Sequence, residues 1–142
     1  MKTTLNSLLT LAAGVALSAA ATYGQSQMNA KIPFEFRTAS GIQSAGEYRI
    51  LPLTHDVMRM QNADTGRSAV TGIGTPNNNP NDNVAKLVFK CGRESGCALW
   101  AMKMGDGRGW TYKAPKLRPS EQERIAVIYV SSRPAAEEAQ QI

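Results

Sequence analysis

The sequence predicts an all-β protein, an antiparallel β-sandwich or open barrel of about seven to eight short strands. Apolar residues alternate with polar ones at a period of two, and turns rich in glycine and asparagine separate the short apolar runs. Only residues 120–123 carry a helical signal. Their Ser-x-x-Glu pattern is typical of a helix N-terminus, so we expect one short helical turn near the C-terminus.

The first half of the chain contains weaker strand signals. Ile32, Phe34 and Phe36 alternate with polar residues and Pro33, so they are expected to share one face of a strand. Pro33 lacks a backbone donor, which favours an edge strand or the start of a strand. The same reasoning predicts strands at 47–51 and 58–60, a hairpin turn at 64–66, a weak return strand at 67–73, and a loop rich in asparagine and proline at 75–83.

The strongest strand signals lie in the second half. Residues 84–91 and 97–104 alternate regularly and flank a five-residue loop with glycine at both ends, which predicts a hairpin. On the first strand Leu87, Phe89 and Cys91 are expected to share a face. On the second the expected face is Ala98, Trp100, Met102 and Met104, and shorter strands are expected at 110–112 and 125–130.

Cys91 and Cys97 flank the loop of this hairpin. In an oxidising compartment two cysteines in a small domain are most simply a disulfide. The alternatives are a redox pair, which more often has the spacing Cys-x-x-Cys, or half of a metal site. Zinc requires four ligands and His55 is the only histidine, so we predict a structural disulfide and no metal site.

The N-terminus resembles a secretory signal peptide. Lys2 is followed by an uncharged, leucine- and alanine-rich run and then by small residues. Cleavage after Ala21 or Gly24 fits the pattern, and Gly24 is favoured because the chain becomes polar at Gln25; an uncleaved anchor helix is the alternative. We therefore expect a signal peptide at 1–24, a single β-sandwich domain at 25–131 and a flexible tail at 132–142. This arrangement predicts a secreted or periplasmic protein with no transmembrane segment after cleavage.

The whole chain has a net charge of +5, and Lys2 is the only charged residue of the predicted signal peptide. Removal of the predicted signal peptide leaves about 118 residues, the size of one domain. The chain has no constellation that commits it to a reaction. His55 followed by Asp56 is the only place for a general base, and no activated serine or cysteine is identifiable beside it. We predict neither a catalytic residue nor a cofactor.

Four short motifs occur along the chain after the predicted signal peptide. They are Ile-Pro-Phe-Glu-Phe at 32–36, Ala-Gly-Glu-Tyr at 45–48, Lys-Leu-Val-Phe at 86–89 and Pro-Ser-Glu at 119–121 followed by Glu123. Together they resemble a group of small exported bacterial proteins that are abundant in Acidobacteria. Ser44 departs from the group, which usually has proline there, and the cysteine pair is not general to it. The resemblance implies a small β-sandwich and export, and it implies no activity.

Residues 108–124 form the surface that we single out for binding. Basic residues attract phosphates, sulfates or uronates, and aromatic rings stack on sugars. The other interpretation is that the rings belong to the core and the charges only keep the protein in solution. The candidate ligand-binding residues are Arg108, Trp110, Tyr112, Lys113, Lys116 and Arg118.

The sequence thus favours an exported, non-catalytic module that binds an anionic polysaccharide or another envelope component. Nucleic acid is not expected as a partner of an exported protein. A small hydrolase that uses His55 and a structural subunit that assembles through edge strands are the alternatives. The sequence leaves the oligomeric state open.

Overall fold

The computed structural model describes residues 26–118 and 121–134. Residues 27–132 form one compact unit. The predicted signal peptide at 1–24, Ser120 of the expected helical turn and residues 135–142 of the expected tail lie outside the described residues.

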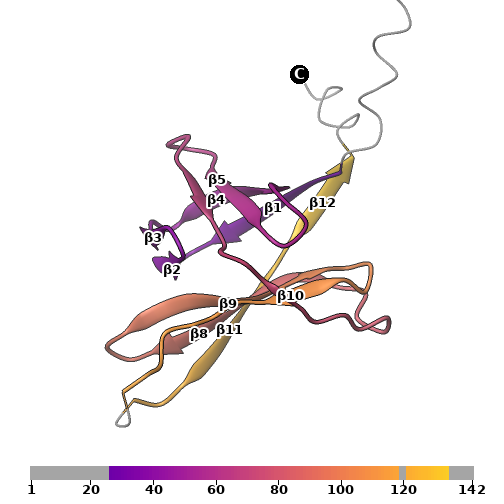
Figure 1. Ribbon diagram of the computed structural model, residues 1–142. Helices are drawn as coiled ribbons and strands as arrows, with labels where there is room; N and C mark the ends of the chain where they lie inside the picture. The colour runs from indigo at the N-terminus through magenta and orange to yellow at the C-terminus, as the bar shows by residue number, and fades with distance from the viewer. Residues whose placement is uncertain (1–25, 119–120, 135–142) are drawn as a thin grey trace, which may run out of the picture. The chain divides into compact units, whose positions relative to one another are not determined.

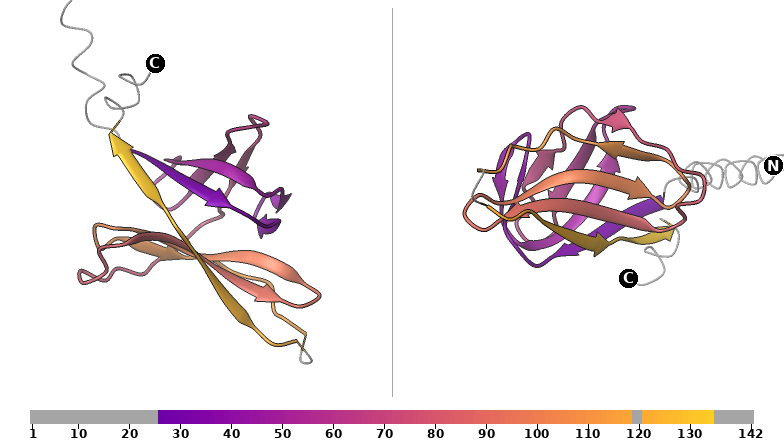
Figure 2. Two further views of the ribbon diagram at one scale, coloured as in Figure 1. Left: turned by 180° about the vertical axis from the view of Figure 1, so that it is seen from behind. Right: turned by 90° about the horizontal axis from the view of Figure 1, so that it is seen from below.

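The structure confirms the all-β fold, with twelve strands and no helix among the described residues. One sheet has the strand order β12-β1-β4-β5-β6 and the other the order β11-β8-β9-β10-β7, with β2 joining β9 and β3 joining β2. Figure 1 and Figure 2 show β1, β4 and β5 in one layer and β8, β9, β10 and β11 in the other. The strands of the first sheet are β1 (Ser26–Ile32), β4 (Gly46–Pro52), β5 (Met58–Asn62), β6 (Ser68–Val70) and β12 (Ser131–Pro134). Those of the second are β2 (Phe36–Thr38), β3 (Gly41–Gln43), β7 (Thr75–Pro76), β8 (Ala85–Gly92), β9 (Gly96–Met104), β10 (Gly109–Thr111) and β11 (Arg124–Tyr129).

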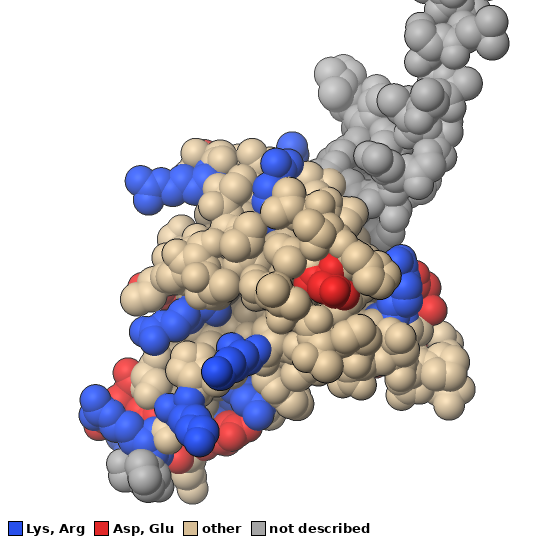
Figure 3. All heavy atoms as spheres, in the orientation of Figure 1, with Lys and Arg blue, Asp and Glu red and all other residues tan. Residues whose placement is uncertain are grey.

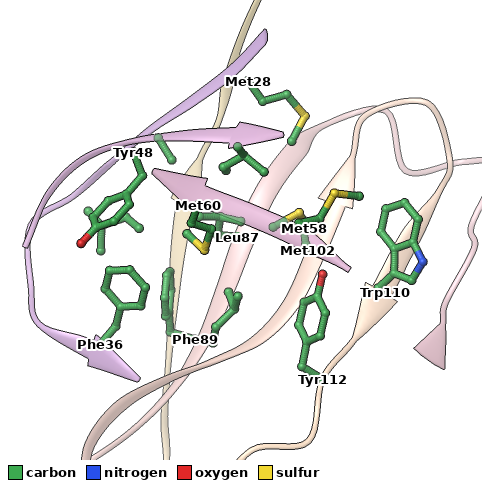
Figure 4. Packing of buried hydrophobic residues seen from close by; sticks show 14 of the residues in the cluster. Met28, Phe36, Tyr48, Met58, Met60, Leu87, Phe89, Met102, Trp110 and Tyr112 are labelled. Atoms are coloured by element: carbon green, nitrogen blue, oxygen red, sulfur yellow. The ribbon is translucent and has the colours of Figure 1, made fainter. Parts of the chain in front are cut away.

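The two sheets share one hydrophobic core. The first sheet contributes Tyr48, Ile50 and Met60, which are each at most 1% exposed. The second contributes rings and long side chains that face them (Figure 4). Phe36 packs edge-on against Tyr48 and Phe89, with ring centroids 5.2 and 5.5 Å apart. This cluster joins the layers, as expected of a β-sandwich.

The expected strand at 32–36 is wrong, because the chain changes sheets there. β1 ends at Ile32, and after an irregular stretch β2 begins at Phe36 in the other sheet. Pro33 has no N–H to donate and ends β1. β1 is not an edge strand either, since it lies between β12 and β4. The apolar pattern still marks the core, because Ile32 and Phe36 are buried and Phe34 packs against the cluster.

The expected face of β9 is also partly wrong, because the strand contains a bulge. Val88 pairs with Ala101 but Phe89 pairs with Leu99, so Trp100 is the extra residue. The bulge places Leu99 in the core and leaves Trp100 half-buried on the outer face. There the ammonium of Lys90 lies 4.1 Å from the centre of its ring.

The expected short helical turn near the C-terminus is wrong. Residues 121–123 are irregular, and β11 begins at Arg124. The carboxylate of Glu121 does not serve a helix end; it accepts hydrogen bonds from the loop between β8 and β9. The strand composition of residues 125–130 then leaves no length in which a helix can be nucleated.

Two turns follow their predicted chemistry. The turn at 64–66 connects β5 to β6, and Gly66 adopts a φ of +73° there. The side-chain oxygen of Asn62 accepts hydrogen bonds from the backbone N–H groups of Asp64 and Thr65. The segment at 75–83 is mostly a loop, but it is fastened to the β9–β10 turn. Asn77 and Asn79 donate their N–H groups to the carbonyls of Gly109 and Gly107.

Candidate functional site

A basic groove lies beside the disulfide hairpin. It has a volume of about 300 Å³ and is lined by β2, β8, the start of β9 and the segment 115–118. A second hollow of about 180 Å³ continues it toward Lys113 and shares Arg37, Ala98 and Pro115 with it. The cationic side chains along the two hollows are Arg37, Lys90, Lys113, Lys116 and Arg118.

A parallel strand pair brings Arg37 to this groove. Phe36 lies opposite Cys97 and Arg37 lies opposite Ala98, so β2 runs alongside the start of β9. Phe36 is buried in the core, and because side chains alternate along a strand its neighbour Arg37 is directed outward. The guanidinium therefore joins lysines that lie some eighty residues later in the sequence.

The disulfide holds the hairpin at the end of the groove. Cys91 and Cys97 are bonded, with an S–S distance of 2.06 Å, and they are cross-strand partners in the β8–β9 ladder. This confirms the predicted pairing. The bond closes the short loop that presents Ser95 and Gly96 to the groove.

Glu121 fixes the same loop from the other side. Its carboxylate accepts the backbone N–H groups of Glu94 and Ser95, each at 2.9 Å, and the Ser95 hydroxyl at 2.7 Å. The Arg118 N–H donates to it at 3.3 Å. The bond from Ser95 above all, together with these backbone donors, lowers the pKa of Glu121 from its usual value. The carboxylate therefore stays charged and ties Arg118 and Glu121 to the hairpin.

Gly92 allows the side chains of Glu121 and Leu117 to pack closely against the hairpin. A Cβ at Gly92 would stand 2.7 Å from a carboxylate oxygen of Glu121 and 2.7 Å from a methyl group of Leu117. Any larger residue would push both side chains away from the hairpin.

The cations of the groove differ in how far they are neutralised. Arg118 pairs with Glu94 at 3.0 Å, and Lys90 lies 3.7 Å from Glu123. Within the described part of the chain, Arg37, Lys113 and Lys116 form no ion pair. In Figure 3 Lys and Arg gather over the end of the molecule where the β8–β9 loop lies, with some acidic residues among them. The groove thus offers unpaired positive charge to an anion.

A larger hollow nearby is lined by side chains of both charges. It has a volume of about 960 Å³ and is lined by Arg93, Glu94, Glu121, Gln122 and Arg124. Both signs of charge are present in equal number, and Glu121 is already engaged with the hairpin. We therefore place the candidate site in the smaller groove.

The structure separates the six ligand-binding residues predicted from the sequence. Lys113, Lys116 and Arg118 lie at the groove. Arg108 lies in the turn between β9 and β10, where its guanidinium pairs with Asp106 at 2.8 Å. The hydrogen bond from the Arg108 backbone, with further contributions from its side chain, lowers the pKa of Asp106 and keeps this pair charged.

Trp110 and Tyr112 belong to the core. They are 4% and 5% exposed and lie among the methionines of both sheets (Figure 4). Burial raises the pKa of Tyr112, so the phenol stays protonated. Tyr112 lines the second hollow, but so little of either ring is exposed that neither presents a face for stacking on a sugar. The feature that the groove presents is positive charge.

Sequence reasoning missed Arg37 and Lys90. Nothing local in the sequence indicates that β2 pairs with β9 or that β8 carries Lys90 toward residues 115–118. The alternation in Phe36-Arg37-Thr38 marks Arg37 only as exposed.

His55 lies in the turn between β4 and β5 and is exposed. The described residues contain no cluster of three or more His, Cys, Asp or Glu that would hold a metal ion. No helix in the described part of the chain is long and apolar enough to cross a membrane.

No known protein family matches the chain, and neither a curated protein nor a solved structure shows significant similarity to it.

Proposed function

We propose that this protein is an exported, non-catalytic β-sandwich module that binds an acidic polysaccharide at the cell envelope. The observation that carries the proposal is the convergence of Arg37, Lys113 and Lys116, all without an acidic partner in the described chain, on one continuous groove.

The groove is suited to a polymer with repeated negative charges. Its two hollows meet at Arg37, so one extended ligand reaches Lys116 on one side and Lys113 on the other. A single exposed ion pair contributes only about 0.2–1 kcal/mol, so measurable affinity requires several contacts at once. Carboxylate or sulfate groups spaced along a sugar chain supply them.

The rigidity of the hairpin supports the same interpretation. The disulfide and the Glu121 carboxylate hold residues 92–97 from two sides, so the wall of the groove needs little ordering when a ligand binds. Preorganised sites lose less free energy to ordering than flexible ones.

Export is supported by the signal-like N-terminus and by the disulfide, since such bonds persist in oxidising compartments. An exported protein meets acidic polysaccharides and anionic lipid headgroups. The two share the same charge chemistry, and the experiment separates them.

The test uses the oxidised chain from Gln25 onward, with uronate and sulfated polysaccharides in one arm and phosphatidylglycerol vesicles in the other. Binding is measured at two salt concentrations. We expect binding to the polysaccharides that weakens with salt, because exposed charges more than about 8 Å apart are screened at physiological ionic strength. Replacing both Arg37 and Lys116 by alanine should weaken it about 2- to 30-fold.

Arg108→Ala is the matched control, because Arg108 is an exposed cation away from the groove. It should bind like the parent. Loss of binding in Arg108→Ala but not in the double variant would move the site to the β9–β10 turn. Binding to the vesicles alone would replace the polysaccharide with a lipid surface, and binding to neither would overturn the proposal.

A further inference from the structure

β11 is an edge strand with an apolar outer face. It ends its sheet, with β8 on one side and no strand on the other among the described residues. The Val130 N–H donates to the Ala85 carbonyl at 3.0 Å. Since backbone groups alternate in direction along an antiparallel strand, those of Ile125, Val127 and Tyr129 point to the open edge. Their side chains are 52%, 40% and 70% exposed.

This edge lacks the features that usually prevent pairing between sheets. Proteins protect edge strands by shortening them or by adding proline, charge or a bulge. At the other end of the same sheet, β7 has two residues and one is Pro76. At one end of the other sheet β6 has three residues. β11 has six residues in unbroken register with β8, without proline and without a charge after Arg124.

We propose that β11 pairs with β11 of a second copy of this chain, antiparallel and about a two-fold axis at Val127. In this register Val127 lies opposite Val127 of the second copy, and Ile125 lies opposite Tyr129 of the second copy. Every residue with free backbone groups meets another such residue, so hydrogen bonds form across the whole strand. The exposed side chains meet as apolar cross-strand pairs.

The side chains of β8 that lie beside β11 do not bring like charges close together across the proposed two-fold axis. Val88 lies beside Val127, while Lys90 and Lys86 lie beside Ile125 and Tyr129. The central row across the dimer is therefore entirely apolar. In the two outer rows the lysines of the two copies are separated by three strand spacings, about 14 Å. That exceeds the screening length of about 8 Å at physiological ionic strength, so these like charges do not oppose the dimer.

The first test measures mass and amide exchange together. Sedimentation of the oxidised chain from Gln25 should show a monomer–dimer equilibrium. The amides of Ile125, Val127 and Tyr129 should exchange more slowly as concentration rises, whereas those of Ala126 and Ile128, already bonded to β8, should be slow throughout. A monomer at all concentrations, or a dimer in which these three amides stay fast, would overturn the proposal.

The second test changes charges across the two-fold axis. Replacing both Ile125 and Tyr129 by lysine sets like charges opposite each other at two places and should weaken dimerisation roughly tenfold. Ile125→Lys with Tyr129→Glu sets opposite charges there and should dimerise more tightly than the double-lysine variant. Within one chain the two positions are four residues apart on a strand, about 13 Å, so they do not contact each other. Lys86 lies beside residue 129 in the monomer and in the dimer alike, so the difference in dimerisation reports on contact between copies.

Ile73→Lys is the matched control, since Ile73 is 82% exposed and lies outside β11. It should dimerise like the parent, and the unfolding midpoint of each variant shows that the fold is intact. Equal dimerisation of the two charge variants would refute the register. The basic groove lies on other residues, so failure of this test is distinct from failure of the proposed binding function.

Discussion

The hydroxyl of Ser95 donates a hydrogen bond of 2.7 Å to the carboxylate of Glu121, across twenty-six residues of chain. Ser95 belongs to the loop of the disulfide hairpin, and Glu121 precedes β11. The bond connects the wall of the basic groove to the strand at the edge of the same sheet. Its contribution to stability depends on the charge of Glu121, and therefore on pH.

Glu121→Gln should lower the unfolding midpoint at pH 7 and have no effect in strong acid. One oxygen can still accept the Glu94 and Ser95 N–H groups, but the new amide group cannot accept from Arg118. The pKa of Glu121 is lowered in the folded state, so the unfolded state binds the proton more tightly. The stabilisation is complete above the unfolded pKa of about 4.3 and is lost as pH falls through the folded pKa.

Thermal unfolding of both proteins between pH 2 and pH 7 checks this prediction. The two midpoints should converge below about pH 4.3. Glu123→Gln is the control, because Glu123 is exposed and its nearest cation, Lys90, is 3.7 Å away. A constant difference between Glu121→Gln and the parent across the whole range would contradict an effect of charge.

Replacing Cys91 and Cys97 together by alanine should lower the free energy of unfolding by about 2 kcal/mol. The bond closes a loop with a sequence separation of 6, so it restricts the unfolded chain only modestly. Urea unfolding of the double variant and of the reduced parent should give similar midpoints. A loss well above this value would mean that the bond also holds the folded hairpin in place, beyond its effect on the unfolded chain.

Tyr48→Phe should cost about 1 kcal/mol of stability. The Tyr48 hydroxyl donates to the Ser44 carbonyl at 2.6 Å and so fastens the turn before β4 to the strand. The ring remains in the core, where it packs on Phe36. Tyr129→Phe removes an exposed hydroxyl and should leave the urea midpoint unchanged, so a loss in both variants would point to a cause other than this hydrogen bond.

The sequence predicted the all-β class and the central hairpin because both depend on local patterns. Leu87, Phe89 and Cys91 alternate and are all buried, and the glycines at 92 and 96 lie at the ends of the loop. The break after Ile32 was missed because apolar alternation continues across it while the chain changes sheets. An alternating pattern records which side chains are buried but not which sheet buries them.

The candidate site was predicted in part for a similar reason. Lys113, Lys116 and Arg118 are close in sequence, and they are close in the fold. Arg37 reaches them only through the parallel pairing of β2 with β9, which has no local signal. Trp110 and Tyr112 were candidates because an aromatic residue between charges looks the same in sequence whether it faces a ligand or the core.

Trp110 provides the sharpest test between these two roles. The Trp110 ring is 4% exposed. A Cβ added at Gly74 would lie 2.7 Å from the Cβ of Trp110, so the tryptophan occupies a closely packed position. Trp110→Ala should therefore cost about 3–5 kcal/mol of stability. Trp110→Phe keeps part of the packing and should remain folded with unchanged affinity for acidic polysaccharide. Trp100→Ala should cost only about 1 kcal/mol, because this half-buried ring lies outside the core cluster and the Lys90 ammonium is stacked over it. If folded Trp110→Phe lost affinity while Arg37→Ala kept it, the aromatic ring and not the basic groove would be the ligand contact.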